Sequence, residues 1–406
     1  MQEIYLDHNA TVSTEPAVLE AMERARAVAG ANPSSRHPAG KRSLRLIEDA
    51  REQLAGLLGA RLDPDDPSAD RIIFTSGATE ANNLAVRGLA LARWAQICEM
   101  REPPSNQKPY VLISSAEHGS VVEPTLALLE FDGFEYDLIG LTEEGHIDNG
   151  RLARQLADPP RGMLPVLIAA ILASHETGVI QPIDTTARMG RDNNVAVHTD
   201  AVQAIGRMPV DFRRLSVTSL SIAGHKLGGP HGIGALVVRG DVPIRPILFG
   251  GGQQGRLRPG TEPADLIVGL VCAVRLRVEA LESTVAKLTA LRDRFESQLL
   301  AGLPDAKIHG RLAERIPQTV SITPRLLDAG ELVDRLGERG VMCSAGAACC
   351  SEEDDPSPTL LAMNLTEAEA KSAIRLSFGP EITAEDLDKA AEIIIDTCRN
   401  WTGGNQ

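Results

Sequence analysis

The chain has 406 residues, of which 43% are hydrophobic and 24% charged, and this length provides interior for two or three domain-sized units. The formal net charge of -14 argues against nucleic acid or an anionic membrane as a partner, because both attract basic patches. No apolar stretch reaches the length of a membrane span, the first ten residues lack a signal-peptide pattern, and the six cysteines lack zinc-ligand spacing. We therefore expect a cytoplasmic enzyme with reduced thiols.

The first half of the chain alternates between helical and strand patterns. Apolar residues recur at helical spacing over 17–29 and 40–59. Short apolar runs come next, at 71–76, 110–115, 166–174, 195–200, 219–224 and 234–239. Several runs are apolar on both faces, which is typical of buried parallel strands. The alternation predicts an α/β domain over 15–262, with a mostly parallel sheet that helices cover on both faces.

The second half of the chain has a different pattern. Helical periodicity runs over 263–303, and we expect this long helix to carry the chain out of the first domain. Further strand and helix patterns follow at 318–324, 329–340, 374–379 and from Ala384 onwards. Thr383 is a natural N-cap for the last helix. The segments 1–14 and 263–406 together predict a smaller α+β domain.

Polar residues follow five of the apolar runs in the first half. In an open parallel sheet, ligands bind at the carboxyl ends of the strands, so these positions are the candidate site. After the first run, Ala78 and Thr79 begin a helical pattern whose free backbone N–H groups suit a phosphate. The other four runs are followed by His118, by His175, by Asp200 with Gln203, and by His225 with Lys226.

These side chains match the requirements of pyridoxal phosphate. The aldehyde of that cofactor requires a lysine amine for a Schiff base, and its pyridine nitrogen requires a carboxylate. Its phosphate requires hydroxyls and helix-end amides, and its flat ring favours a stacked planar group. Lys226, Asp200, Thr79 and His118 can supply these in turn. By spacing alone, an α/β site for another nucleotide or phosphate ligand fits as well.

Eight segments of the chain carry a family resemblance. In order, they are IYLDHNAT, NPSSRHPAGK, TSGATEANNLAVRG, SSAEHGSVVEP, HETGVIQPI, HTDAVQAIG, AGHKLGGPHGIGAL and MCSAGAACCS. Together they resemble the cysteine desulfurases of the iron–sulfur-cluster type, in class V of the aminotransferase superfamily. The resemblance runs from about Ile4 to the final helix. It implies a homodimeric, fold-type-I transferase that depends on pyridoxal phosphate, with a large domain around a mostly parallel seven-stranded sheet and a small α+β domain.

The resemblance also implies roles for individual residues. Lys226 resembles the buried lysine that forms the Schiff base and moves the proton of the substrate α-carbon. His118 resembles the histidine that stacks on the cofactor ring and serves as an acid–base group. The remaining cofactor contacts implied are Asp200 with the pyridine nitrogen, Gln203 and His175 with the ring hydroxyl, Ala78, Thr79 and His225 with the phosphate, and Thr261 with the phosphate across the dimer interface.

On the substrate side, Arg375 resembles the arginine that clamps the substrate carboxylate, for which a planar guanidinium suits bidentate binding. Asn32 lies in a motif near the substrate. Cys349 resembles the nucleophile that removes sulfur from L-cysteine, keeps it as a persulfide and releases L-alanine. It lies on a segment, 344–358, that we expect to be a mobile loop. A sulfur-acceptor or iron–sulfur scaffold protein would be the partner, and Cys350 is a spectator or a resolving thiol.

The chain departs from the family pattern at the cofactor. His175 stands where the family usually has asparagine, and Ala223 stands where it has a phosphate-binding serine. The lost contact costs roughly 0.5–1.5 kcal/mol, which loosens the cofactor without removing it. Two alternatives therefore stay open. One is another class V enzyme, a selenocysteine lyase or an aminotransferase-like enzyme, in which Cys349 is incidental. The other is a weakened homologue that acts as a binding partner.

Overall fold

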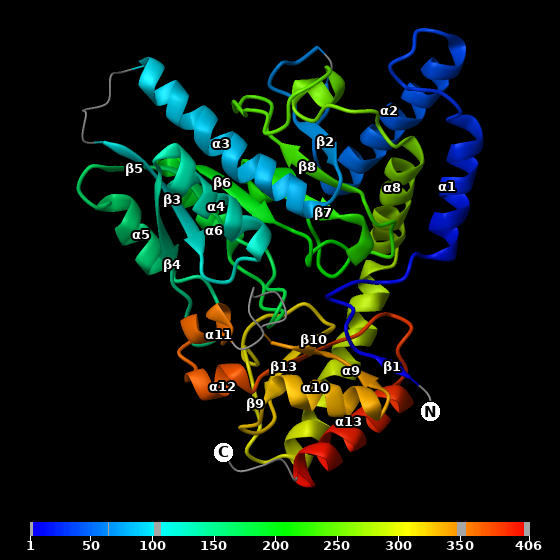
Figure 1. Ribbon diagram of the computed structural model, residues 1–406, viewed down its shortest axis with the longest axis vertical. Coiled ribbons are helices and arrows are strands. Elements are labelled where there is room, and N and C mark those ends of the chain that lie inside the picture. Colours follow the sequence, from blue (N-terminus) through cyan, green and yellow to red (C-terminus); the bar gives the residue numbers. More distant parts are fainter. Residues whose placement is uncertain (1–2, 64, 101–106, 347–354, 402–406) are drawn as a thin grey trace.

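The computed structural model describes residues 3–63, 65–100, 107–346 and 355–401. Figure 1 shows a large body, which carries the blue-to-green elements, above a smaller body of yellow-to-red elements. The N-terminus lies beside the smaller body, although most of the first hundred residues belong to the larger one. Among the helices of the described ranges, none is long and apolar enough to cross a membrane.

The large body is built on a seven-stranded sheet. Its strands are β2 (Arg71–Thr75), β3 (Lys108–Ser114), β4 (Glu135–Ile139), β5 (Met163–Ala169), β6 (Ala196–Asp200), β7 (Ser219–Ala223) and β8 (Gly234–Val238). Their order across the sheet is β2-β8-β7-β6-β5-β3-β4, and only β8 runs antiparallel to its neighbours. The predicted α/β class and the mostly parallel sheet are thus confirmed.

Helices cover both faces of this sheet (Figure 1). One face packs on α3 (Ala78–Met100) and α4 (Gly119–Asp132), whose apolar side chains share a core with the strands. The opposite face packs on α1 (Pro16–Val28), α2 (Pro38–Leu58), α5 (Asn149–Ala157), α6 (Ile183–Asp192), α7 (Phe212–Leu215) and α8 (Ala264–Glu279). Two short 3-10 turns, η1 (Gly224–Lys226) and η2 (Gln253–Arg256), complete the large body.

The smaller body contains two short sheets. The antiparallel one has the order β12-β13-β10-β9, from β9 (Lys307–Ile308), β10 (Thr319–Thr323), β12 (Ser344–Ala345) and β13 (Ile374–Ser377). The other pairs β1 (Ile4–Tyr5) with β11 (Val341–Met342). These strands share a core with α9 (Leu281–Gly302), α10 (Ala329–Glu338) and α13 (Ala384–Arg399). Thr383 caps the last helix, as predicted, in a reciprocal pair with Asp386.

At the boundary between the bodies, the chain does not divide into two consecutive parts. Between β13 and the cysteine segment, α11 (Pro358–Ala362) and α12 (Glu367–Lys371) place apolar side chains in the core of the large body. The single helix predicted over 263–303 is wrong, because α8 ends at Glu279 and α9 begins at Leu281. The buried side chains of α8 belong to the large core and those of α9 to the small one, so the chain changes direction where it changes core. The predicted domain boundary at residue 262 stays a prediction.

Candidate active site

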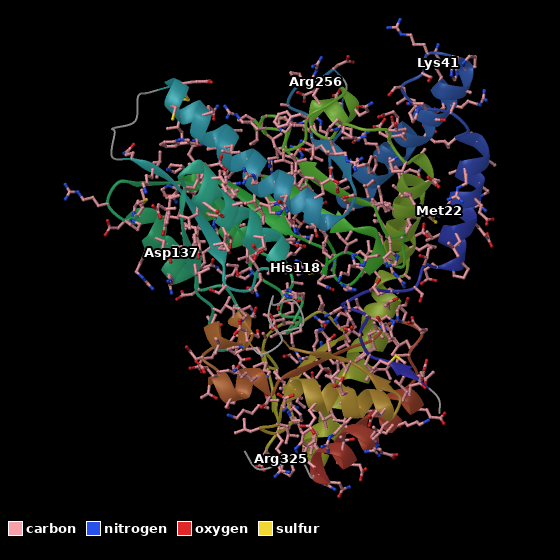
Figure 2. The ribbon with its side chains drawn as sticks, in the orientation of Figure 1. Met22, Lys41, His118, Asp137, Arg256 and Arg325 are labelled. Atoms are coloured by element: carbon pink, nitrogen blue, oxygen red, sulfur yellow. The ribbon has the colours of Figure 1, made fainter. Side chains whose placement is uncertain are left out.

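A cavity of about 660 Å³ lies at the carboxyl edge of the large sheet, within the usual range for small-molecule sites. Its walls come from the turns after β2, β3, β5, β6 and β7, and from Asp7, Asn9, Ala10, Ser344 and Arg375 on the other side. Figure 2 places the labelled His118 where the large body meets the small one. Nine of the site residues predicted from the sequence line this cavity, namely Ala78, Thr79, His118, His175, Asp200, Gln203, His225, Lys226 and Arg375.

Lys226 ends the turn η1, directly after the buried strand β7. Its Nζ donates hydrogen bonds to the carbonyl oxygens of Asn9 at 2.5 Å and Ala10 at 2.6 Å. The expectation of a buried amine needs correction, since the side chain is half-buried. The reason is geometric: the side chain lines the cavity, which leaves part of it accessible. A cavity-facing amine is what covalent binding of a ligand requires.

Asp200 and Gln203 follow β6 and are both buried. The carboxylate of Asp200 accepts hydrogen bonds from Asn82 Nδ2 at 2.7 Å and from the backbone N–H of Val202 at 2.9 Å. Gln203 Nε2 donates to the carbonyl oxygen of Asn9 at 3.0 Å, and Arg207 donates to Gln203 Oε1. Both side chains are therefore held in one orientation at the wall of the cavity.

Two imidazoles face each other across the cavity wall. His118 caps α4, and its Nδ1 accepts from the backbone N–H of Ser120 at 3.1 Å. The ring of His175 lies edge-on to it, with 5.3 Å between ring centroids. Burial lowers the pKa of both rings, far below its usual range for His175, and the cations Lys226 and Arg375 add to the effect. Both histidines are neutral near pH 7 as a result.

A third imidazole, His225, stacks on His231 with 5.4 Å between ring centroids. Its Nδ1 lies 3.3 Å from the hydroxyl of Thr11. Burial, followed by the nearby Lys226 charge and His231, lowers the pKa of His225 to about 4. This ring is therefore an uncharged hydrogen-bonding group at neutral pH.

The turn between β2 and α3 forms part of the cavity wall. Ala78 and Thr79 open the 23-residue helix α3, whose first N–H groups have no partner within the helix. A Cβ on Gly77 would meet nothing within 4 Å, whereas a Cβ on Gly234 would lie 2.6 Å from the backbone of Gly77. Strand β8 thus packs tightly beneath the turn and leaves its upper side open. Ala223 lines the cavity without a hydroxyl.

Arg375 reaches the cavity from β13 in the small body. Its guanidinium donates to Asp7 Oδ1 at 2.8 Å, to Ser344 Oγ at 3.2 Å and to the carbonyl oxygen of His175 at 3.3 Å. Its Nε is buried and has no partner among the described residues, and the same holds for Nδ1 of His175. Buried polar atoms without partners are uncommon in proteins.

The remaining predicted residues are not brought into this cavity. Thr261 and Asn32 are exposed and line a separate pocket of about 390 Å³. Cys349 and Cys350 lie outside the described residues. The described neighbour Cys343 is an unsuitable nucleophile, because burial, with Asp7 nearby, raises the pKa of its thiol to about 12.

Sequence reasoning missed several residues that shape the site. Asp7 and Asn9 lie in the first motif, and their contacts join Arg375 and Lys226 to the N-terminal segment. Asn82 lies behind Asp200, and Ser120 contacts both Asn82 and His118 at the cavity wall. The only signal in the sequence was that these positions fall inside the quoted motifs, because the contacts themselves join residues far apart in the chain.

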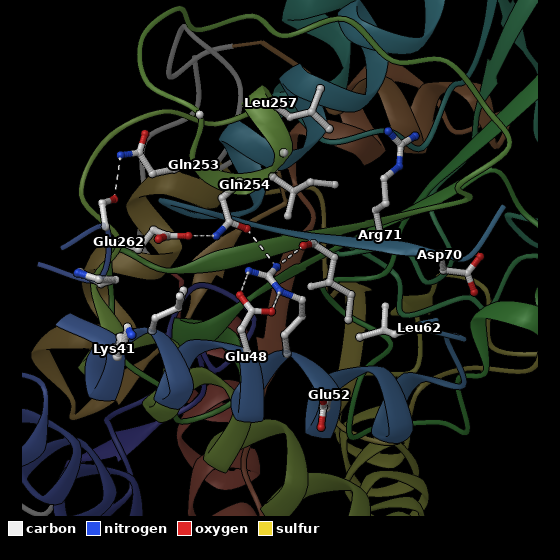
Figure 3. Close-up of a pocket in the computed structure, with 18 of the residues that line it drawn as sticks. Lys41, Glu48, Glu52, Leu62, Asp70, Arg71, Gln253, Gln254, Leu257 and Glu262 are labelled. Carbon is white, nitrogen blue, oxygen red and sulfur yellow. Dashed lines mark hydrogen bonds and ion pairs between the residues drawn. The ribbon is translucent and has the colours of Figure 1, made fainter. Parts of the chain in front are cut away.

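A larger cleft of about 950 Å³ lies elsewhere on the large body, between α2 and the turn η2. Figure 3 shows that Arg51 and Glu48 are paired with each other in its wall. Arg51 Nε lies 3.0 Å from Glu48 Oε2, and its guanidinium also donates to Gln254 Oε1 at 3.1 Å. Gln254 in turn donates to Glu262. No histidine stands among the described residues that line this cleft.

The smaller cavity fits pyridoxal phosphate. It combines an amine, a carboxylate, imidazoles, a helix N-terminus and a guanidinium, which are the groups that the aldehyde, the pyridine nitrogen, the ring, the phosphate and a substrate carboxylate need.

Comparisons with known proteins agree with this assignment. The class-V aminotransferase model matches residues 4–390. The cysteine desulfurase IscS of Dictyoglomus turgidum is 33% identical over 393 residues, which are 97% of this chain and 94% of that protein. The NifS-like protein of Rickettsia africae has a TM-score of 0.82 at 29% identity, over 98% of this chain and 99% of that one. A structure of SspA in complex with cysteine has a TM-score of 0.74 at 31% identity, over 93% and 99%.

The family model and the curated relative each cover nearly the whole chain, including every element that lines the cavity. The chain therefore belongs to the class-V aminotransferases and, within them, to the pyridoxal-phosphate-dependent cysteine desulfurases.

Proposed function

We propose that this protein is a cysteine desulfurase that uses pyridoxal phosphate to take sulfur from L-cysteine, release L-alanine and keep the sulfur as a persulfide on Cys349. One observation carries the proposal: Lys226, Asp200, His118 and Arg375 converge on a single cavity from four separate elements. The printed names of the relatives support the substrate, since they are cysteine desulfurases and one related structure contains cysteine.

The bound cofactor supplies an electron-accepting ring that weakens the bonds at the substrate α-carbon. Lys226 would hold the cofactor aldehyde through Nζ and then move the proton of the α-carbon. Asp200 would accept from the protonated pyridine nitrogen, and Gln203 and His175 would contact the ring hydroxyl. His118 would lie against the ring face.

The phosphate would bind at the start of α3, to the backbone N–H of Ala78, to Thr79 and to His225. Arg375 would bind the substrate carboxylate through its planar fork. These two anchors stand on opposite sides of the cavity, one on the large body and one on the small body. They would orient a ligand bound between them in the cavity that Lys226 also lines.

The sulfur step balances without an external oxidant. The thiolate of Cys349 attacks the sulfur of the bound cysteine, the C–S bond breaks, and an S–S bond forms on the enzyme. The electrons of the broken C–S bond stay with the carbon skeleton, which takes up a proton and leaves as alanine. Cys350 is not needed for this balance.

The proposal extends to partners and location. Thr261 is exposed and lies away from the cavity of its own chain, and we propose that it reaches the phosphate site of the second copy in a homodimer. Asn32 lines the same pocket as Thr261 and would join that interface near the substrate. A sulfur-acceptor protein, such as an iron–sulfur scaffold, and a cytoplasmic location complete the proposal.

The test uses purified protein loaded with pyridoxal phosphate and given L-cysteine with a reductant. Alanine and sulfide are measured together, for the parent protein and for Cys349→Ala and Cys350→Ala. We expect equal amounts of both products, lost with Cys349→Ala and retained with Cys350→Ala. Cofactor binding without any sulfide would overturn the desulfurase proposal and leave another class V substrate as the answer.

A further inference from the structure

We propose that Asn82 is a positioning residue, which aligns Asp200 and His118 through one buried hydrogen-bond network behind the cavity. The inference rests on the proposed function, in which Asp200 and His118 face the cofactor. Asn82 itself does not line the cavity, and its side chain is fully buried on α3.

The amide of Asn82 contacts three side chains, two from β6 and one from α4. Its Nδ2 donates to Asp200 Oδ2 at 2.7 Å and to Ser120 Oγ at 2.8 Å. Its Oδ1 lies 3.0 Å from His198 Nε2. Both N–H groups of Nδ2 and the oxygen Oδ1 are therefore engaged. The side chain cannot rotate without breaking a buried hydrogen bond.

The orientation of the amide follows from His198. This imidazole is completely buried, and burial lowers its pKa to about 3, so it is neutral. Its Nδ1 lies 2.8 Å from the hydroxyl of Ser219. If the amide of Asn82 were reversed, its oxygen would face the Asp200 carboxylate. Both groups are acceptors, so no hydrogen bond could form between them. The nitrogen must face Asp200, so His198 carries its proton on Nε2 and donates to Asn82 Oδ1.

The network then reaches His118 through Ser120. The hydroxyl of Ser120 accepts from Asn82, so its own proton is free for His118 Nδ1, which lies 2.8 Å away. The backbone N–H of Ser120 points at the same nitrogen from 3.1 Å. With two donors at Nδ1, the neutral ring carries its proton on Nε2 and is a hydrogen-bond donor toward its surroundings. The charged or titratable groups that face the ring are Asp200, Lys226, Arg375 and His175.

The experiment compares Asn82→Ala with Asn83→Ala, a substitution at the next helix position. Asn83 is only partly buried and bonds to a backbone carbonyl of its own helix. The readout is the affinity of the cofactor-free protein for pyridoxal phosphate, followed by fluorescence, together with the pH dependence of the absorbance of the loaded protein. Thermal unfolding without cofactor checks that each variant is folded.

We expect Asn82→Ala to bind the cofactor roughly ten- to a hundredfold more weakly, as for a lost hydrogen bond to a charged group, and to shift the pH dependence of the absorbance. Asn83→Ala should stay within about twofold of the parent. An Asn82→Ala protein that is folded and binds within about twofold, with unchanged pH dependence, overturns the inference. Because cofactor affinity is measured without turnover, this result is separate from any failure of desulfurase activity.

If Asn82→Ala does not fold, Ser120→Ala decides the matter. It removes one donor from His118 Nδ1 and keeps Asn82 on Asp200. In the cofactor-free protein, the pKa of His118, followed by NMR of its ring protons, should then rise, because a donor to the neutral ring is lost. An unchanged His118 titration would overturn the network.

Discussion

The two main hollows of the large body differ in how their charged groups are used. The larger cleft pairs Arg51 with Glu48 and holds Glu262 by a hydrogen bond from Gln254, so these side chains are engaged within its wall (Figure 3). The smaller cavity gathers Lys226, the imidazoles and Arg375 from separate elements. The larger volume of the cleft therefore does not mark it as the active site. The smaller cavity is marked by titratable groups that converge on it, several of them histidines with lowered pKa values.

The largest effect on activity is expected when a lysine of the smaller cavity is replaced and compared with a lysine of the larger cleft. Lys226→Ala should lower the rate of alanine formation by at least about a thousandfold, because the amine both binds the cofactor and moves a proton. Lys41→Ala, an exposed lysine of the larger cleft, is the matched control and should keep the parent rate. Similar losses in both variants would mean that the two hollows are not functionally different.

The next effect compares two arginines. Arg375→Lys keeps the charge but loses the planar fork, so kcat/KM for L-cysteine should fall about 10- to 100-fold, mainly through a higher KM. Arg51→Lys makes the same change in the larger cleft, where the guanidinium serves only structural contacts. It should lower the melting temperature and leave KM unchanged. A changed KM in Arg51→Lys would contradict the separation of roles.

A third prediction concerns pH and the buried network beneath the smaller cavity. The folded protein holds His198 neutral, since burial lowers its pKa to about 3, whereas the unfolded chain takes up a proton near pH 6.5. The unfolded state therefore binds more protons between these values, and the free energy of unfolding falls as the pH is lowered through this window. Between pH 6.5 and 5, His198 alone should cost about 2 kcal/mol.

Denaturant unfolding of the cofactor-free protein at several pH values measures this slope. His198→Asn should be less stable near neutral pH but should show a shallower dependence on pH. An identical slope in the variant would assign the acid sensitivity to other groups, such as His309, whose pKa burial also lowers to about 4.

The smallest effect is expected at His175. Its pKa lies well below the usual range because of burial, so the ring is neutral at working pH and a neutral amide can replace its hydrogen bonds. His175→Asn should change kcat/KM by no more than about threefold between pH 6 and 8. A strong change in the pH profile would instead give His175 a proton-transfer role that the neutral ring does not predict.

Some of the structure could not be predicted from the sequence, for identifiable reasons. Strand β4 was missed because its residues, EYDLI, are mostly half-exposed and include two carboxylates, as suits the edge of a sheet. The break at Ala280 carries neither glycine nor proline. It exists because α8 and α9 pack on different cores, and no local signal records that.

The sequence by itself determined the α/β class, the alternation of elements and the family, because periodicity and motifs are local properties of the chain. It also identified most of the residues that line the cavity, since strand ends can be read from where apolar runs stop. Only the tertiary structure decided that Asn9 holds Lys226, that Asp7 pairs with Arg375 and that Asn82 joins Asp200 to Ser120. Those contacts join residues that are far apart in the chain, and only packing brings them within hydrogen-bond distance.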